Sequence, residues 1–141
     1  MKDAGFALAQ AYTTLLANLT YQNQPVPLYS LKAPDDAVSP YVILGPWQGQ
    51  RDNTKQSFGQ TGEINLDVVT RFAGDVVSKK AASDIADLIT NLITPTPGAT
   101  LSVPGFSCWL TVVSSTQDIS IETDTETLIR KLITVQHSLT L

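Results

Sequence analysis

The hydrophobic positions along the chain predict two amphipathic helices. In residues 3–19, apolar side chains recur at spacings of three and four, which is the pattern of a helix with one buried face. Residues 76–93 show the same spacing, with lysine, aspartate, serine and asparagine opposite the apolar stripe. The Thr-Pro-Thr-Pro-Gly segment at 94–98 ends the second helix, because proline cannot continue the hydrogen-bond ladder.

Three strands are predicted between these helices. Residues 26–31 form a short strand, and the two prolines nearby place it at the edge of a sheet. Residues 40–45 are nearly all apolar, which indicates a strand buried on both faces. Residues 61–72 alternate apolar and polar side chains, so one face meets the core and the other meets water or a partner.

Two further strands are predicted to close the fold, at 105–117 and 127–138, with a polar, acidic turn region at 118–127 between them. The order of elements is then helix, three strands, helix, two strands. This order indicates an α+β fold in which two α-helices pack on one face of a mostly antiparallel β-sheet. The length of 141 residues fits a single domain spanning 1–141.

The polar loop at 46–60 is the first candidate interaction site. It carries Trp47, Arg51, Lys55 and Phe58 among Gln, Asn, Ser and Gly residues. Tryptophan and arginine are enriched at interface hot spots, and long loops in compact domains often carry function. The alternative is that Trp47 folds back over the edge of the sheet. The first interpretation predicts a protein-interaction surface at this loop.

Composition and charge narrow the classes of partner. Charged residues make up 16% of the chain, against about 25% in a typical domain, which suits a subunit that packs against copies or partners but also fits an ordinary soluble protein. The net charge is −4, and the densest basic pair is Lys79-Lys80. Binding along nucleic-acid phosphates needs clustered basic side chains, so it is not expected. No apolar run reaches the length of a membrane span.

The residue inventory argues against the common forms of catalysis and cofactor binding. The chain has one cysteine, Cys108, and one histidine, His137, which fall on different predicted strands. We expect Cys108 to be a buried small hydrophobe in a reducing compartment and His137 to be solvated at the surface. One His and one Cys cannot build a zinc site, and no glycine-rich nucleotide loop occurs. We therefore expect no enzyme activity, no catalytic residue and no cofactor.

An acidic stretch offers one alternative to this expectation. If the chain is extended there, Glu122, Asp124 and Glu126 point the same way and could hold a hard cation such as calcium. The stretch lacks the glycine turn and ligand order of an EF-hand loop. A solvated loop, or a face that contacts a basic patch on a neighbour, explains the same residues, so no metal site is assigned.

The order and spacing of these segments resemble the tail terminator, or tail-completion, family of long-tailed bacteriophages over essentially the full chain. An N-terminal helix is followed by Pro-Val-Pro-Leu-Tyr at 25–29 and by Pro-Tyr-Val-Ile-Leu-Gly at 40–45. A polar loop then leads through Phe58 into the alternating strand. A helix with Ala and Ile on its buried stripe and two closing strands complete the pattern.

The resemblance implies a structural virion protein of the tail or neck, assembled in the host cytoplasm. It implies a homo-oligomeric ring, typically a hexamer, that caps the tail tube at its head-proximal end, ends tube polymerisation and meets the head–tail connector protein. DNA would pass through the channel without specific binding, and no membrane contact is implied. Asn65, Asp67 and Arg71, which point away from the expected core, would then face a neighbour or the channel.

Two alternatives remain at this stage. A head–tail connector or neck subunit would have a similar α+β build. A small non-viral module could instead hold a ligand under Trp47 and Trp109.

Overall fold

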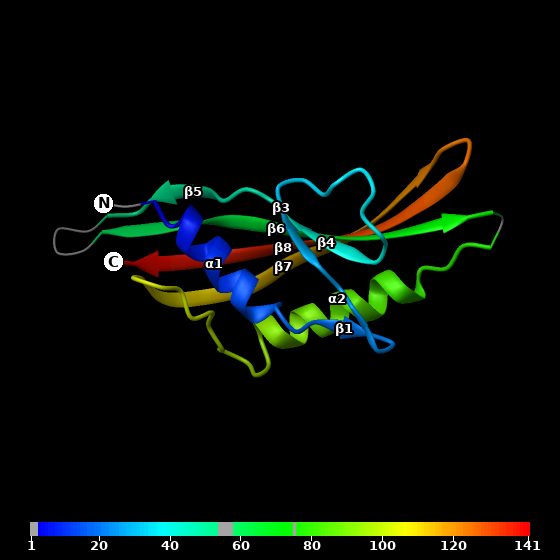
Figure 1. The fold of residues 1–141 in the computed structure, drawn as a ribbon. Helices are drawn as coiled ribbons and strands as arrows, with labels where there is room; N and C mark the ends of the chain where they lie inside the picture. Colours follow the sequence, from blue (N-terminus) through cyan, green and yellow to red (C-terminus); the bar gives the residue numbers. More distant parts are fainter. Residues whose placement is uncertain (1–2, 54–57, 75) are drawn as a thin grey trace.

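The computed structural model describes residues 3–53, 58–74 and 76–141. Its centre is a sheet with the spatial order β3 (Leu28–Ser30), β4 (Tyr41–Leu44), β6 (Gly59–Ala73), β8 (Glu126–Thr140) and β7 (Ser107–Glu122) (Figure 1). The β3–β4 pair is parallel, and the remaining described pairs of this sheet are antiparallel. The predicted mostly antiparallel sheet, with 26–31 at its edge, is confirmed.

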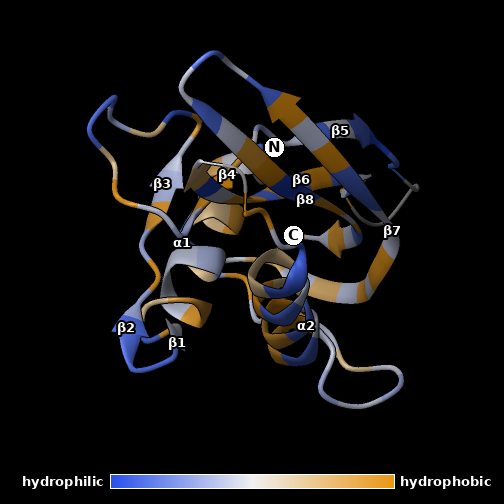
Figure 2. Cartoon of the chain, turned by 90° about the vertical axis from the view of Figure 1, so that its right-hand side faces the viewer, coloured by the Kyte–Doolittle hydropathy of each residue, from blue (hydrophilic) through white to orange (hydrophobic). Residues whose placement is uncertain are grey.

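Both helices, α1 (Gly5–Leu15) and α2 (Lys80–Ile93), lie on one face of this sheet (Figure 2), as the apolar stripes predicted. The core fills the space between helices and sheet. Ile64, Leu66 and Val68 of β6 point into it, so the predicted alternation of that strand is confirmed. The largest fully buried side chains come from both helices and from β4, β6 and β8, and include Leu8, Tyr12, Leu44, Ile64, Ile85, Ile89, Ile133 and Leu139.

Each helix is shorter than its apolar pattern. The first helix ends at Leu15, and residues 20–25 form a small hairpin of β1 (Thr20–Tyr21) and β2 (Gln24–Pro25). Leu16 and Leu19 follow the helix but are buried in the core. The spacing of apolar residues therefore continues beyond the last helical residue, which is why the predicted helix was too long. The second helix begins at Lys80 rather than 76, and the Lys80 N–H is bonded to the Ser78 hydroxyl (3.1 Å).

The predicted turn region at 118–127 is wrong. The β7 strand continues to Glu122, β8 begins at Glu126, and the turn between them covers only 123–125. The polar residues of this stretch belong to an edge strand whose side chains are mostly exposed, so it needs no apolar alternation. The neighbouring strand β8 forms an ion pair with this stretch, in which Lys131 Nζ lies 3.1 Å from Asp118 Oδ1.

The predicted polar loop at 46–60 is also wrong in part, because β5 (Gln48–Arg51) lies within it and pairs with the start of β6. All four residues of β5 are exposed, so hydrophobic periodicity could not reveal this strand. Two glycines bring the strands together: Gly49 faces Gly62, and a Cβ at Gly62 would overlap the Gln48 carbonyl oxygen and lie 2.6 Å from the Gly49 Cα. Close approach of the two backbones therefore requires glycine at position 62.

Replacing Gly62 with alanine is expected to displace β5 from β6 and to lower the free energy of unfolding by about 1–3 kcal/mol, the usual cost of forced overpacking. Urea unfolding of the two proteins measures this difference. Glu63→Ala is the matched control, because Glu63 is the next residue of β6 and is exposed, so it should change stability by less than about 0.5 kcal/mol. Equal effects of the two substitutions would contradict the close-approach argument.

A smaller apolar cluster lies on the sheet face opposite the helices. Ala37, Tyr41 and Val69 are buried there, and Tyr29, Ala33, Ile43 and Leu128 pack against them. The chain between β3 and β4 passes over this face (Figure 2). The outward face of β6 is therefore covered near Val69, although the sequence predicted water or a partner along the whole strand.

Candidate protein-interaction surfaces

Trp47 is half-buried and packs against the main core, which matches the alternative in which it folds back over the sheet. Its indole Nε1 lies 3.4 Å from Gln60 Oε1, and its ring centroid lies 6.4 Å from that of His137. The same Gln60 oxygen accepts the Ala4 N–H (3.1 Å). Gln60, at the start of β6, therefore links the start of α1 to Trp47, the residue that precedes β5.

The other residues proposed from the 46–60 segment are distributed differently. Arg51 is exposed at the end of β5, and Phe58, just before β6, is 52% exposed. The Phe58 carbonyl accepts the Leu141 N–H (3.0 Å), so its backbone is tied to the C-terminus. Lys55 lies outside the described residues. Arg51 and Phe58 remain available for a contact with another molecule.

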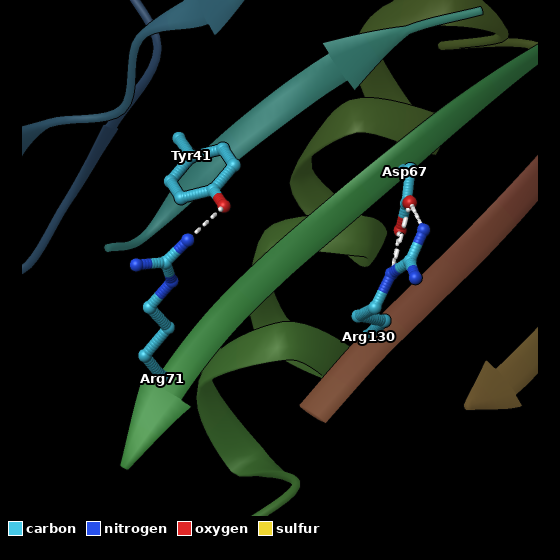
Figure 3. A network of polar contacts seen from close by, with 4 residues as sticks. All are labelled: Tyr41, Asp67, Arg71 and Arg130. Carbon is cyan, nitrogen blue, oxygen red and sulfur yellow. Dashed lines mark hydrogen bonds and ion pairs between the residues drawn. The ribbon is translucent and has the colours of Figure 1, made fainter. Parts of the chain in front are cut away.

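Asp67 and Arg71 are occupied by partners within the chain, as Figure 3 shows. Asp67 is buried and forms an ion pair with Arg130 of β8, whose Nε donates to both carboxylate oxygens (3.0 and 3.3 Å) and whose Nη2 also bonds to Oδ2. Arg71 Nη2 donates to the Tyr41 hydroxyl (3.2 Å). These groups join β4, β6 and β8 on the face opposite the helices.

The third residue proposed on this face, Asn65, is half-buried, and its Oδ1 accepts the Thr134 hydroxyl proton at 3.0 Å. The sequence placed Asn65, Asp67 and Arg71 on one face correctly but did not identify Arg130 or Thr134 as partners. Period-two alternation puts Arg130 and Thr134 on one face of β8, yet only the β6–β8 register brings them beside Asn65 and Asp67. Asp67 is therefore engaged in an ion pair inside the chain, and its carboxylate is not free to contact another molecule.

His137 contradicts the expectation of a solvated surface histidine, because it is fully buried. Its Nε2 lies 2.6 Å from the Tyr12 hydroxyl, and its Nδ1 lies 3.2 Å from Thr111 Oγ1. Burial lowers the pKa of His137 to about 4 and raises the pKa of Tyr12. The imidazole is therefore neutral at pH 7 and joins α1 to β7 and β8.

Cys108 and His137 lie on different strands, as predicted, and the two side chains are close to each other. The Cys108 Sγ is 3.8 Å from His137 Nδ1 and 3.4 Å from Thr111 Oγ1, because β7 and β8 are neighbours. The thiol is half-buried rather than buried. Among the described residues, the side chains that contact the imidazole nitrogens are those of Tyr12, Cys108 and Thr111, and none of them is a carboxylate.

The acidic stretch forms the tip of the β7–β8 hairpin. Glu122 ends β7 and Glu126 begins β8, so the two residues lie on different strands, and the turn is closed by the Thr123 N–H bonded to the Glu126 carbonyl (2.8 Å). Within residues 3–53, 58–74 and 76–141, no three His, Cys, Asp or Glu side chains gather in a way that could hold a metal ion. No helix among those residues is long and apolar enough to cross a membrane.

Besides the edge of β3, two described strands of the sheet, β5 and β7, leave one edge free for protein contacts. The outer edge of β7 is 16 residues long and carries Trp109, which is 58% exposed. The outer edge of β5 lies across the sheet, with β6 and β8 between the two. Trp109 is therefore exposed on the edge strand β7, whereas Trp47 precedes β5 and packs against the main core. Unpaired edges present rows of backbone donors and acceptors to other chains.

Comparison with known proteins gives a family for this fold. A family model described as tail completion protein gp17 matches residues 8–135. A chain in the solved structure "Virion of native gene transfer agent (GTA) particle" is 14% identical, with a TM-score of 0.67 over 97% of this chain and 96% of that one. Among curated protein sequences, a search found no significant match.

The family match runs from within α1 to within β8, and so includes the helices, the sheet and both free edges. The structural match has low identity and supports the shared fold alone. The chain therefore belongs to the tail completion protein gp17 family, and it is a structural protein of the phage tail and of the virion.

Proposed function

We propose that this chain caps the tail tube at its head-proximal end, stops tube polymerisation and forms the interface to the head connector as a hexameric ring. The observation that carries this proposal is the family match across residues 8–135. The two free sheet edges add to it, because a subunit with two different adhesive edges can form head-to-tail contacts with its own copies.

The partners that follow are further copies of the chain, the tail tube protein and the head–tail connector protein. The charge of the chain is compatible with DNA that passes without being held. The net charge is −4, and one of the basic side chains, Arg130, is occupied by Asp67. Such a surface attracts few phosphates, and DNA can slide past it.

Light scattering after size exclusion is expected to give a ring of six copies of 15.2 kDa, about 91 kDa. Negative-stain images of the same peak should show six-fold rings, and added tail tubes should carry the chain at one end only. A chain that stays monomeric and never binds tail tubes would contradict the proposal. Binding to the connector without binding to tubes would instead favour a neck subunit.

A further inference from the structure

We propose that β5 of one copy pairs with β7 of the next copy and thereby continues the sheet across the subunit boundary. The inference rests on the proposed ring and names the strands that form its contacts. Among the described strands, β5 pairs with β6 alone, and β7 pairs with β8 alone. Each strand therefore has one side on which backbone N–H and C=O groups lack a strand partner.

The two edges stand at the same level along the strands. Gln48 of β5 lies opposite Glu63, Glu63 lies opposite Gln136, and Gln136 lies opposite Val112 of β7. The contact between copies thus requires a rotation but no large shift along the strands. Head-to-tail contacts of this kind close into a ring, whereas a shift along the axis would produce an open helix.

The strand directions are also compatible. Each step from β5 to β6, from β6 to β8 and from β8 to β7 is antiparallel, so β5 and β7 run in opposite directions. In a cyclic ring every copy keeps the same orientation relative to the axis. A neighbouring β5 placed beside β7 would therefore form an antiparallel ladder, which is the slightly more stable arrangement per residue.

The shape of the β7 edge selects a short partner strand. Irregularities at Trp109 and Ser114 interrupt the register, and the regular stretch between them, Leu110–Val113, has the same length as the four-residue β5. A groove of about 410 Å³ opens along this stretch, between residues 94–98 and residues 111–113. Bulges commonly prevent edge pairing, so the two irregularities confine regular pairing at this edge to Leu110–Val113.

The chemistry of the two edges identifies a second copy as the occupant. From Ser107 to Gln117 the β7 strand carries no charged residue, and β5 carries only Arg51. Pairing would therefore bring no like charges together. Trp109 lies at the end of the same stretch and supplies an exposed aromatic side chain of the kind that anchors interfaces.

Disulfide cross-linking between engineered cysteines tests this pairing in the full chain. Gln48→Cys and Val112→Cys are introduced together in a Cys108→Ser background; both sites are exposed, so the fold should tolerate them. Residues directly opposite on paired strands have Cβ atoms about 4.5–5.5 Å apart, close enough for a disulfide after small adjustments. Mild oxidation should produce a ladder of covalent multimers up to the size of the ring.

The matched control combines Val112→Cys with Ser30→Cys, an exposed residue of the other edge strand, β3, and should give no ladder. A second pair at the same level, Gln50→Cys with Leu110→Cys, should reproduce the first result. Thermal unfolding of each reduced variant shows whether the fold is intact. A ladder from both same-level pairs and none from the control supports the proposal.

The remaining outcomes overturn it in distinguishable ways. Rings seen by light scattering without a ladder from either same-level pair would exclude the β5–β7 contact and leave the proposed ring in place. Covalent dimers from Val112→Cys alone would show that β7 pairs with β7 of another copy. A mass of 15.2 kDa at every concentration, without cross-links and without binding to tail tubes, would overturn both proposals.

Discussion

Lowering the pH from about 7 to about 4 is expected to lower the free energy of unfolding by about 3 kcal/mol through His137 alone. Burial lowers the pKa of His137 to about 4 in the folded chain, whereas in the unfolded chain the side chain has the ordinary histidine value of 6.5. Between these values the unfolded state binds the proton and the folded state does not. Stability is therefore fully present above about pH 6.5 and falls as the pH decreases.

Urea unfolding at several pH values between about 4 and 7 measures this loss, which should approach about 1.4 kcal/mol per pH unit in the middle of the range. The control is His137→Gln, because an amide can still bond to the Tyr12 hydroxyl and Thr111 but does not titrate there. The variant should be less stable at pH 7 and should depend less on pH. An equal slope in both proteins would exclude His137 as the source.

Replacing Arg130 with alanine is expected to lower the free energy of unfolding by about 2–3 kcal/mol. The substitution leaves the buried Asp67 carboxylate without its cationic partner, and removing one member of a buried pair is costly for that reason. Because 31% of the Arg130 side chain is exposed, the effect should be smaller than in a fully buried pair. Urea unfolding at pH 7 gives the value.

The matched control is Lys131→Ala, which removes the neighbouring ion pair with Asp118. Asp118 is 52% exposed, so this pair should contribute less than about 1 kcal/mol. A double variant that also replaces Asp67 with alanine should recover part of the Arg130→Ala loss, because no buried charge then remains. If Lys131→Ala costs as much as Arg130→Ala, burial of Asp67 does not explain the difference.

The sequence located the elements that have an apolar face. Ile64, Leu66 and Val68 alternate as a strand, and Ile85 and Ile89 recur as a helix, because burial against a core imposes the local period. By contrast, β5 and the second half of β7 are polar strands on sheet edges. One or both of their faces meet water, so these strands show no alternation of apolar and polar residues from which they could be predicted.

The residues that the sequence suggested for a protein interface fall into two groups, those that have a partner inside the chain and those that stay exposed. Trp47, Asn65, Asp67 and Arg71 were recognised as polar or aromatic groups away from the predicted core, and the structure gives each a contact inside the chain. Arg51 and Phe58 stay exposed. Nothing local distinguishes these two groups, because the partners of the first group lie up to 69 residues away in the sequence.

The sequence by itself determined the α+β class, the two helices on one face, the core positions and the resemblance to the tail terminator family, since all of these depend on local periods and their order. Only the tertiary structure decided that His137 is buried beside Tyr12, that Arg130 pairs with Asp67, and that the edges of β5 and β7 stand at one level across the sheet. These features depend on the register between strands. Register is set by long-range pairing and by the close approach of backbones at residues such as Gly62. It therefore cannot be predicted from any short segment of the sequence.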